Sequence, residues 1–427
     1  MNCWTLWSTW IIFSLTYVGL ALGKVPGLRM DRAGIALVGA TLMLVTGALS
    51  MQEAVSPESI DFKTLFLLFG MMIVVGVLRL SGFFERLVGI AVRHITTPKG
   101  LLGATIVLSG VFSAFLINDV VCVALTPLVL HVARRKNFDP IPHLIGLATA
   151  ANIGSTGTIT GNPQNIYIGT HSGISYFRFA FRLLPLAMLG LGLTYLVVCL
   201  VYRRCLAAFA EQGPRGTDEM LDEKTGTEGL PRSRAHARLQ IKALTVTLTA
   251  VALFFTGLPL ELVALGAAAV VLLDRIKPEK TFHQVDWSLL VMFTGLFIVV
   301  HAFQVNVVAA WGIEGWTWLL KRPTDLFSLV SAALSNLVSN VPAVLLLEPV
   351  AQAVPEATRE TAWLALAMSS TFAGNLTVLG SVANLIVVEI ASRKGVAISF
   401  WEYCKVGIPL TILTLVLGIG WLQFVRY

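Results

Sequence analysis

The chain has 427 residues, of which 56% are hydrophobic and only 13% are charged, and its mean hydropathy is +0.78. Soluble domains carry about 25% charged residues, so this composition excludes a soluble globular protein and predicts an all-α polytopic protein in a lipid bilayer. The net charge of +7 does not indicate a nucleic-acid partner, because the basic residues gather in short loops between apolar segments.

The first apolar segments are three predicted spans, Trp4–Leu22, Gly34–Ser50 and Phe62–Leu80. The first lacks a basic leader and a small-residue cleavage site, which favours a retained span over a signal peptide. A basic loop, Lys24–Arg32, separates the first two spans. Ser81–His94 has the amphipathic pattern of a helix that lies along the membrane surface.

The next segment, Thr96–Arg134, is too apolar and too long for one span, and it has basic residues at both ends. This predicts a hairpin of two short helices (about 96–134) that enters and leaves on the same side, with Asn118 and Asp119 at its tip. A carboxylate at the bilayer centre costs ~2.5–3.5 kcal/mol on insertion scales. Asp119 is therefore predicted to be a cation ligand or a proton-titrating group, and the alternative is a helix-capping residue.

Leu144–Gly169 is apolar at its ends but carries NIGSTGTITGNPQN at its centre, residues 152–165. Gly, Thr, Asn and Pro at this density break a helix, and unwound backbone is tolerated in a bilayer only inside protein or beside water. We therefore expect a broken transmembrane helix (about 144–169), followed by a span at Arg178–Tyr202. The polar segment 203–242 is expected to be a cytoplasmic linker between two transmembrane halves, 1–202 and 243–427.

The second half has a similar order of segments. Its expected elements are spans at Ala243–Leu258, Glu261–Leu273 and Trp287–Phe303, an interfacial stretch with Trp311, Trp316 and Trp318, a hairpin (about 326–353), a broken helix (about 363–388) and a last span at Val406–Phe424. Glu348 lies near the end of this hairpin. A position at a mouth facing water is one of two equally good explanations for this acid, and a role inside the protein is the other.

The two halves repeat each other in three places. VDWSLLVMFTG (285–295) matches IDFKTLFLLFG (60–70) at an offset of 225 residues. SNLVSNVPAVLLLEP (335–349) matches SAFLINDVVCVALTP (113–127) at an offset of 222, and TVLGSVAN (377–384) matches TITGNPQN (158–165) at an offset of 219. Asp61 and Asp286, which match, begin two spans and are expected to cap helices.

The distribution of basic residues predicts the orientation of the repeat. With the first basic loop and the linker in the cytoplasm, span 62–80 runs inward and its counterpart 287–303 runs outward. The first hairpin then opens to the cytoplasm and the second to the exterior. This is an inverted five-plus-five helix repeat with two re-entrant hairpins and two broken transmembrane helices in the cell (inner or plasma) membrane. Such repeats place substrate and coupling-ion sites near the midplane.

The polar tips and unwound segments offer the oxygen ligands that a sodium ion requires, so we expect Na⁺ at both hairpin tips. The cation-binding candidates are Ser113, Asn118, Asp119, Gly154, Ser155 and Gly161 in the first half and Ser339, Asn340, Gly374, Asn375 and Gly380 in the second. A small anionic substrate between the tips would be held by helix N-termini and polar side chains. The substrate-binding candidates are Asn118, Thr158, Asn165, Asn340, Thr377 and Asn384. The alternative for the Thr, Gly and Asn residues is a kinked helix with polar packing between helices.

At FLINDVVCVALTP, NIGSTGTITGNPQN and SNLVSNVPAV the chain resembles the ion transporter superfamily. That group includes arsenite permeases, NhaD-type sodium/proton antiporters, citrate transporters and divalent anion/sodium symporters. The resemblance implies a scaffold and a transport domain, an elevator-like movement, a homodimer in many members, and cation sites that pair Asn118 with residues 154–161 and Asn340 with residues 374–380. The tips here read Ile117-Asn118-Asp119 and Ser339-Asn340-Val341, whereas dicarboxylate symporters carry Ser-Asn-Thr at both tips. The first tip is closer to the arsenite-permease and NhaD side, in the branch of anion transporters.

These observations predict a secondary active transporter that moves a small anion together with sodium or protons. Metalloid efflux and sodium/proton exchange are the alternatives within transport. An intramembrane enzyme would need a paired Asp, an HExxH motif or a Ser-His dyad, and none of these stands out. No ATP-binding motif is present, so we expect neither a primary pump nor a cofactor beyond the coupling ion. A channel stays open as an alternative, but paired closed hairpins suit alternating access better.

Overall fold

The structure is a computed structural model, and it describes residues 3–22, 30–93, 95–207, 234–274, 277–308, 319 and 321–424. Helices form all the regular elements in these ranges. The longer helices of the first half are α1 (Cys3–Leu22), α2 (Arg32–Val45), α4 (Phe62–Leu80), α5 (Phe83–Arg93), α6 (Pro98–Phe115), α7 (Asn118–Arg135), α8 (Pro140–Ser155), α9 (Pro163–His171) and α10 (Tyr176–Val201), with short helices α3 (Met51–Ala54) and α11 (Arg203–Ala207).

The second half continues in the same order. Its helices are α12 (Arg234–Phe254), α13 (Leu260–Leu272), α14 (Pro278–Phe282), α15 (Trp287–Phe303), α18 (Asp325–Val338), α19 (Asn340–Ala353), α20 (Glu356–Ala373), α21 (Val382–Arg393) and α22 (Phe400–Phe424). Seven of the described helices are long and apolar enough to cross a membrane, and three shorter apolar helices accompany them. The predicted all-α polytopic membrane protein is confirmed at this level.

Several element boundaries differ from the expectation: α20 begins at Glu356 instead of about 363, α22 begins at Phe400 instead of Val406, and the differences at α12 and α2 have visible local causes. α12 begins at Arg234, so the last part of the expected linker is helical. The reason is local packing: Leu239 is buried, and Gln240 accepts a hydrogen bond from Arg86 (2.9 Å) and donates one to the Gly82 carbonyl (3.3 Å) beside α5. Residues 208–233 of that linker, and the stretch with Trp311, Trp316 and Trp318, lie outside the described residues.

α2 also differs from the expectation, because it ends at Val45 and not at Ser50. Gly47 has a φ of +72°, a left-handed conformation that turns the chain out of the helix. Ser50 then starts α3 through a capping box: its hydroxyl accepts from the Glu53 N–H, and the Glu53 carboxylate accepts from the Ser50 N–H.

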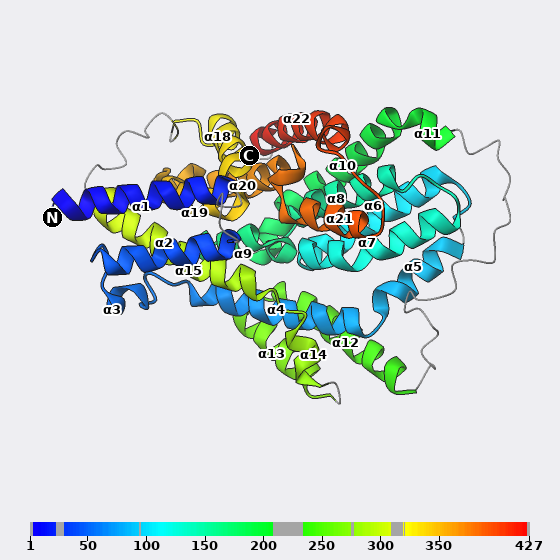
Figure 1. The fold of residues 1–427 in the computed structure, drawn as a ribbon, viewed down its shortest axis with the longest axis horizontal. Coiled ribbons are helices and arrows are strands. Elements are labelled where there is room, and N and C mark those ends of the chain that lie inside the picture. Colours follow the sequence, from blue (N-terminus) through cyan, green and yellow to red (C-terminus); the bar gives the residue numbers. More distant parts are fainter. Residues whose placement is uncertain are drawn as a thin grey trace.

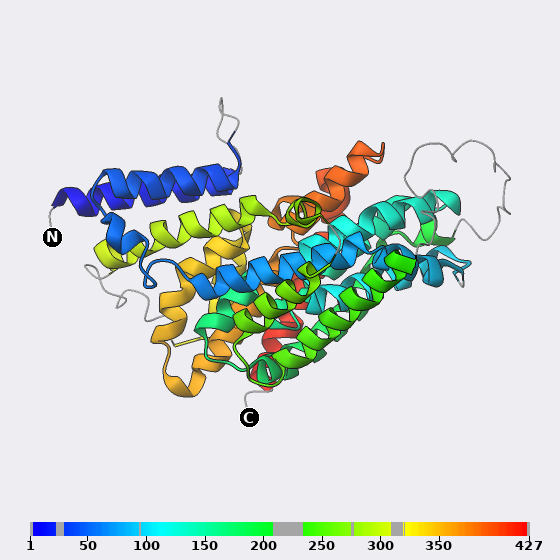
Figure 2. The same ribbon diagram turned by 90° about the horizontal axis from the view of Figure 1, so that it is seen from below.

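The helices form two groups that pack on each other (Figure 1, Figure 2). The outer group, called here the α4 layer, contains α1, α2, α4, α12, α13 and α15, and in both views α4 runs between α15 and α13. The other group, called here the broken-helix bundle, contains α6–α10 and α18–α22. The pairs α6–α7 and α18–α19 lie toward opposite ends of the long axis, with α9, α20 and α21 between them (Figure 1).

Contacts within the α4 layer are reciprocal between the halves. A Cβ on Gly70 of α4 would lie 2.7 Å from the Ala264 carbonyl carbon of α13, and a Cβ on Gly295 of α15 would lie 2.7 Å from that of Ala36 in α2. Gly70 and Gly295 are a matched pair of the repeat. The same close helix contact therefore occurs twice, each time between a helix of one half and a helix of the other, as in a two-fold interface.

The matched aspartates cap the two central helices of this layer, as expected. Asp61 accepts from the N–H groups of Lys63 (3.1 Å) and Thr64 (3.3 Å) at the start of α4. Asp286 accepts from the Leu289 N–H (3.0 Å) at the start of α15. Both carboxylates thus satisfy backbone donors that a helix leaves free at its N-terminus.

Candidate functional site

The first hairpin tip lies between α6 and α7. Leu116 has extended backbone angles (φ −122°, ψ 155°), and α7 begins directly afterwards at Asn118. Asn118 is buried, and its Nδ2 donates to Asn152 Oδ1 of α8 (3.1 Å). Asp119 is half-buried in the first turn of α7, and within the described residues no hydrogen bond or ion pair involves its carboxylate. A carboxylate at this place is therefore available to a ligand.

The second hairpin tip is a single residue, Ser339, between α18 and α19. Its φ of +78° with ψ of 160° is a conformation that is almost restricted to glycine and that costs ~1–3 kcal/mol in other residues. Its hydroxyl accepts from Arg32 Nη1 of α2 (3.4 Å), and the guanidinium is half-buried. A cation from the α4 layer thus reaches the second tip, where Val341 replaces the acid of the first tip.

Each broken helix is held by one asparagine side chain. Asn165 of α9 donates to the carbonyls of Ser155 (3.1 Å) and Thr158 (3.0 Å), across the unwound segment after α8. Asn384 of α21 donates to the matched carbonyls, those of Gly374 (2.7 Å) and Thr377 (3.1 Å), after α20. Carbonyls that lose their helical partner are thereby satisfied, which a buried break requires.

The glycines of the unwound segments allow close packing of backbone. A Cβ on Gly154 would lie 2.1 Å from the Gly110 carbonyl oxygen, and a Cβ on Gly161 would lie 2.2 Å from that of Ser155. Gly380 approaches the Gly374 carbonyl oxygen in the same way, at 2.8 Å. No larger residue fits these positions without moving the backbone, so a packing role is visible for them whether or not their carbonyls bind a cation.

The centre of the bundle is Asn152, which is 1% exposed. Its Nδ2 donates to the Oδ1 atoms of Asn375 (2.9 Å) and Asn384 (3.0 Å) in the second half. Its Oδ1 accepts from Asn118 at the first tip and from the Ser381 hydroxyl (3.0 Å), which caps α21. One side chain therefore joins the first hairpin tip to both sides of the second unwound segment.

A second contact is the counterpart of the Asn152–Ser381 contact. Asn162, which caps α9, donates to Thr371 Oγ1 of α20 (3.3 Å). Asn162 and Ser381 are 219 residues apart, and so are Asn152 and Thr371, which is the offset of the third sequence match. The broken helices therefore contact each other reciprocally, as the helices of the α4 layer do.

Buried oxygens without a hydrogen-bond partner in the described protein also come in matched pairs. Ser113 Oγ and Asn118 Oδ1 are such atoms at the first tip, and Ser335 Oγ and Asn340 Oδ1 are their counterparts at the offset of 222. Asn336 Oδ1 is a further one at the second tip. Buried polar atoms are nearly always paired, so matched unpaired oxygens at both tips indicate positions that accept a ligand.

The predicted residues thus divide into two sets. Ser113, Asn118 and Asn340 have free buried oxygens at the tips, and Asp119 and Ser339 adjoin them. The other set already makes hydrogen bonds inside the protein: Ser155 Oγ with Asn152 and Asn162, Asn375 with Asn152 and Thr149, Thr158 with Ala114, and the two clamping asparagines with their carbonyls. This second set shapes the site, and Asn165 alone among the bonded side chains named here keeps an unpaired buried oxygen, its Oδ1.

The sequence analysis did not single out Asn152, Thr371 or Ser381. The offset of 219 residues could have found them, because it matches Asn152 with Thr371 and Asn162 with Ser381. Arg32 was seen only as part of a basic loop. No pattern in the sequence connects it with Ser339, because 307 residues separate the two.

A sequence model of the citrate transporter family matches residues 10–373. The chain belongs to the citrate transporter family. It is 32% identical to the silicon efflux transporter LSI3 of Oryza sativa subsp. japonica, over 96% of each chain. It is also 30% identical to a 46 kDa membrane protein of Mycobacterium leprae, over 97% of each chain, and 26% identical to a relative named arsB in Dictyostelium discoideum, over 96% of this chain and 91% of that one.

Two solved transporters share the fold. The YdaH transporter of Alcanivorax borkumensis aligns over 99% of this chain and 96% of its own with a TM-score of 0.57 and 16% identity. MtrF of Neisseria gonorrhoeae aligns over 100% and 95% with a TM-score of 0.60 and 13% identity. This member of the citrate transporter family is therefore a secondary transporter with that all-helical architecture, and it is not an enzyme.

Proposed function

We propose that this chain moves a small anion across the membrane, coupled to sodium or protons, by an elevator-type alternating-access movement. The carrying observation is the matched set of unpaired buried oxygens at the two hairpin tips. An inverted five-plus-five repeat with re-entrant hairpins explains why the contacts of both layers are reciprocal. In the proposed elevator movement, the α4 layer is the scaffold and the broken-helix bundle moves relative to it.

Coupling cations fit the tips because such ions bind to oxygens at unwound transporter segments, and the tips add unpaired amide and hydroxyl oxygens. At the first tip, Ser113 and Asn118 offer free oxygens and Asp119 offers a charge beside them. At the second tip, Asn340 and Ser335 offer the matched oxygens without a carboxylate. We assign Na⁺ or a proton to the first tip through Asp119, and Na⁺ to the second.

The anion fits the second tip because the charges there are of the opposite sign. Arg32 approaches Ser339 from α2, and the N-terminus of α19 points its free N–H groups toward the same place. The first tip carries an acid, whereas the second carries a base. A substrate anion beside Arg32 would also lie near the Asn340 amide.

The second candidate is efflux of a metalloid hydroxide, and the relatives named for silicon efflux and arsB favour it. Silicic acid and arsenite are neutral near pH 7, so they would not need a guanidinium. Arg32→Gln should weaken citrate transport at least tenfold and leave arsenite and silicic acid transport unchanged, with Arg32→Lys intermediate. An equal loss for neutral and charged probes would remove Arg32 from the anion site.

Asp119→Asn tests the coupling ion in proteoliposomes. The amide keeps the size and the polar contacts of the side chain but removes the charge, so cation-driven transport should fall at least tenfold while the variant stays folded. A thermal-shift screen of citrate, arsenite and silicic acid, with and without sodium, identifies the substrate to use. Wild-type uptake with wild-type sodium and pH dependence in Asp119→Asn would refute the assignment.

A further inference from the structure

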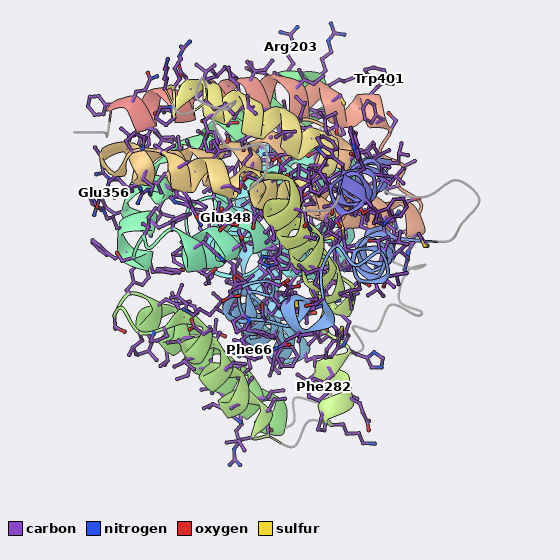
Figure 3. All side chains as sticks on the ribbon, turned by 90° about the vertical axis from the view of Figure 1, so that its left-hand side faces the viewer. Phe66, Arg203, Phe282, Glu348, Glu356 and Trp401 are labelled. Atoms are coloured by element: carbon purple, nitrogen blue, oxygen red, sulfur yellow. The ribbon has the colours of Figure 1, made fainter. Side chains whose placement is uncertain are left out.

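A second cluster of titratable side chains lies away from both tips. One explanation for Glu348 of α19 was a position facing water. The structure does not support it, because Glu348 is only 7% exposed and lies among the helices (Figure 3). Tyr167 of α9 donates its hydroxyl to Glu348 Oε2, and Gln352 Nε2 donates to Glu348 Oε1 (2.8 Å). Both carboxylate oxygens are thus held inside the protein, where an isolated charge is costly.

The cluster continues from Glu348 toward the protein surface. The rings of Tyr167 and His171 stack with centroids 4.1 Å apart. His171 Nδ1 lies 3.6 Å from Asp61 Oδ2, and Thr170 Oγ1 donates to the same carboxylate oxygen (3.1 Å). The His171 side chain is 26% exposed and the Asp61 side chain 12%, so exposure decreases from His171 to Glu348.

The groups of the cluster act on one another. Those that influence the charge of Glu348 are Tyr167 and His171 from α9 and Asp61 from the start of α4. Among the described residues, α15, α18 and α20 also pack on α19 without adding a further charged group to this set. Tyr17 of α1 lies near Tyr167, but its hydroxyl donates to the Pro342 carbonyl (3.1 Å).

The repeat shows that this cluster is not needed by the fold. The positions that match Tyr167, His171 and Glu348 hold Ile386, Ile390 and Thr126. Only the aspartate is shared, because Asp61 and Asp286 both cap helices. The repeated helix, break and helix of α20 and α21 therefore form without a titratable side chain at the positions that match Tyr167 and His171.

We propose that Asp61, His171, Tyr167 and Glu348 form a proton-binding site that is separate from the hairpin tips. The His171 imidazole adjoins Asp61 and stacks on Tyr167, which donates to Glu348, so a proton bound within this group compensates carboxylate charge, and its loss leaves like charges in a partly buried site. The cluster joins α4 of the outer layer to α9 and α19 of the bundle, so proton binding changes the contact across which the bundle would slide. This step rests on the proposed function for its role in transport.

The transport test follows proton movement with a pH-sensitive dye inside proteoliposomes while citrate, arsenite or silicic acid is added separately. Glu348→Gln and His171→Asn should lower the number of protons moved per substrate at least tenfold, while substrate exchange without a pH gradient continues. Asp61→Asn should act similarly, since asparagine keeps the helix cap while it removes the charge. Unchanged proton movement in Glu348→Gln and His171→Asn would overturn the proposal.

A second measurement does not depend on transport. Infrared spectroscopy of the purified protein should show a carboxyl band that titrates with pH, is lost in Glu348→Gln and changes its midpoint in His171→Asn. A band with the same midpoint in His171→Asn would show that the two groups do not share a proton, and it would overturn the proposal. If substrate moves in the wild type with sodium alone and without protons, the proton site fails while the proposed function stands.

Discussion

Asn152 is the side chain on which the contact between the two broken helices depends most, and its replacement gives the sharpest test of that contact. It makes four hydrogen bonds to other helices or tips, two as donor and two as acceptor. Hydrogen bonds between membrane helices average about 0.6 kcal/mol, which gives a loss of about 2.4 kcal/mol for four. Asn118, Asn375 and Asn384 would also keep buried polar atoms without partners, which raises the cost.

Asn152→Leu, which keeps the branched shape of the side chain but has no polar atoms, should therefore destabilise the protein by ~2–4 kcal/mol. Asn152→Asp separates the two kinds of bond: its carboxylate still accepts from Asn118 and Ser381 but opposes the oxygens of Asn375 and Asn384. We expect both variants to lower the Tm by several degrees. The assay is thermal unfolding in detergent, followed by size-exclusion chromatography.

Thr371→Val is the matched control, because Thr371 occupies the corresponding position of the second half and accepts only two side-chain hydrogen bonds, from Asn162 and Gln164. Its effect should be about half that of Asn152→Leu. If Asn152→Leu unfolds at the wild-type temperature, the hydrogen bonds at the centre do not hold the halves together. An Asn152→Asp variant as stable as the wild type would show that the two donor bonds contribute nothing.

Two further predictions concern the repeat. Gly70→Ala and Gly295→Ala should each destabilise the protein by ~1–3 kcal/mol through overpacking and should lower the Tm by similar amounts. Gly192→Ala is the control and should leave the Tm unchanged, because a Cβ there meets open space. Unequal effects of Gly70→Ala and Gly295→Ala would contradict the reciprocal contact. Cysteines placed at Thr97 and Arg322 in a cysteine-free background should be labelled from opposite sides of the membrane by an impermeant maleimide. Labelling of both from one side would refute the inverted topology.

The breaks and the repeat could be predicted from the sequence because they have local causes. Gly, Asn and Pro at high density leave no helical alternative in residues 152–165, and Gly and Asn recur 219 residues later. Aspartate before an apolar run is likewise a local signal, and Asp61 does cap α4. α12 begins earlier than expected because its first turns are polar, and contacts of Gln240 with Arg86 and Gly82 and of Lys242 with Asp274 help to stabilise them.

The contacts that carry the site could not be predicted in this way. Tyr167 and Glu348 are 181 residues apart, and neither stands in a pattern that indicates the other. Free and bonded asparagines look alike in sequence, although Asn340 has an unpaired oxygen at a tip and Asn384 is consumed as a clamp. Which polar residue is free depends on how distant helices pack, and packing is a property of the whole fold.

The repeat separates the architecture of this transporter from its chemistry. Residues that both halves share, such as the asparagine of each tip, hold the fold or form sites of the same kind in both halves. Several charged groups are different, because their matched positions are uncharged: Val341 stands at the position that matches Asp119, and Ile390 and Thr126 stand at those that match His171 and Glu348. A ligand shifts an equilibrium only through its differential interaction with the two states, so the proposed coupling between ion and substrate should depend on these unshared charges.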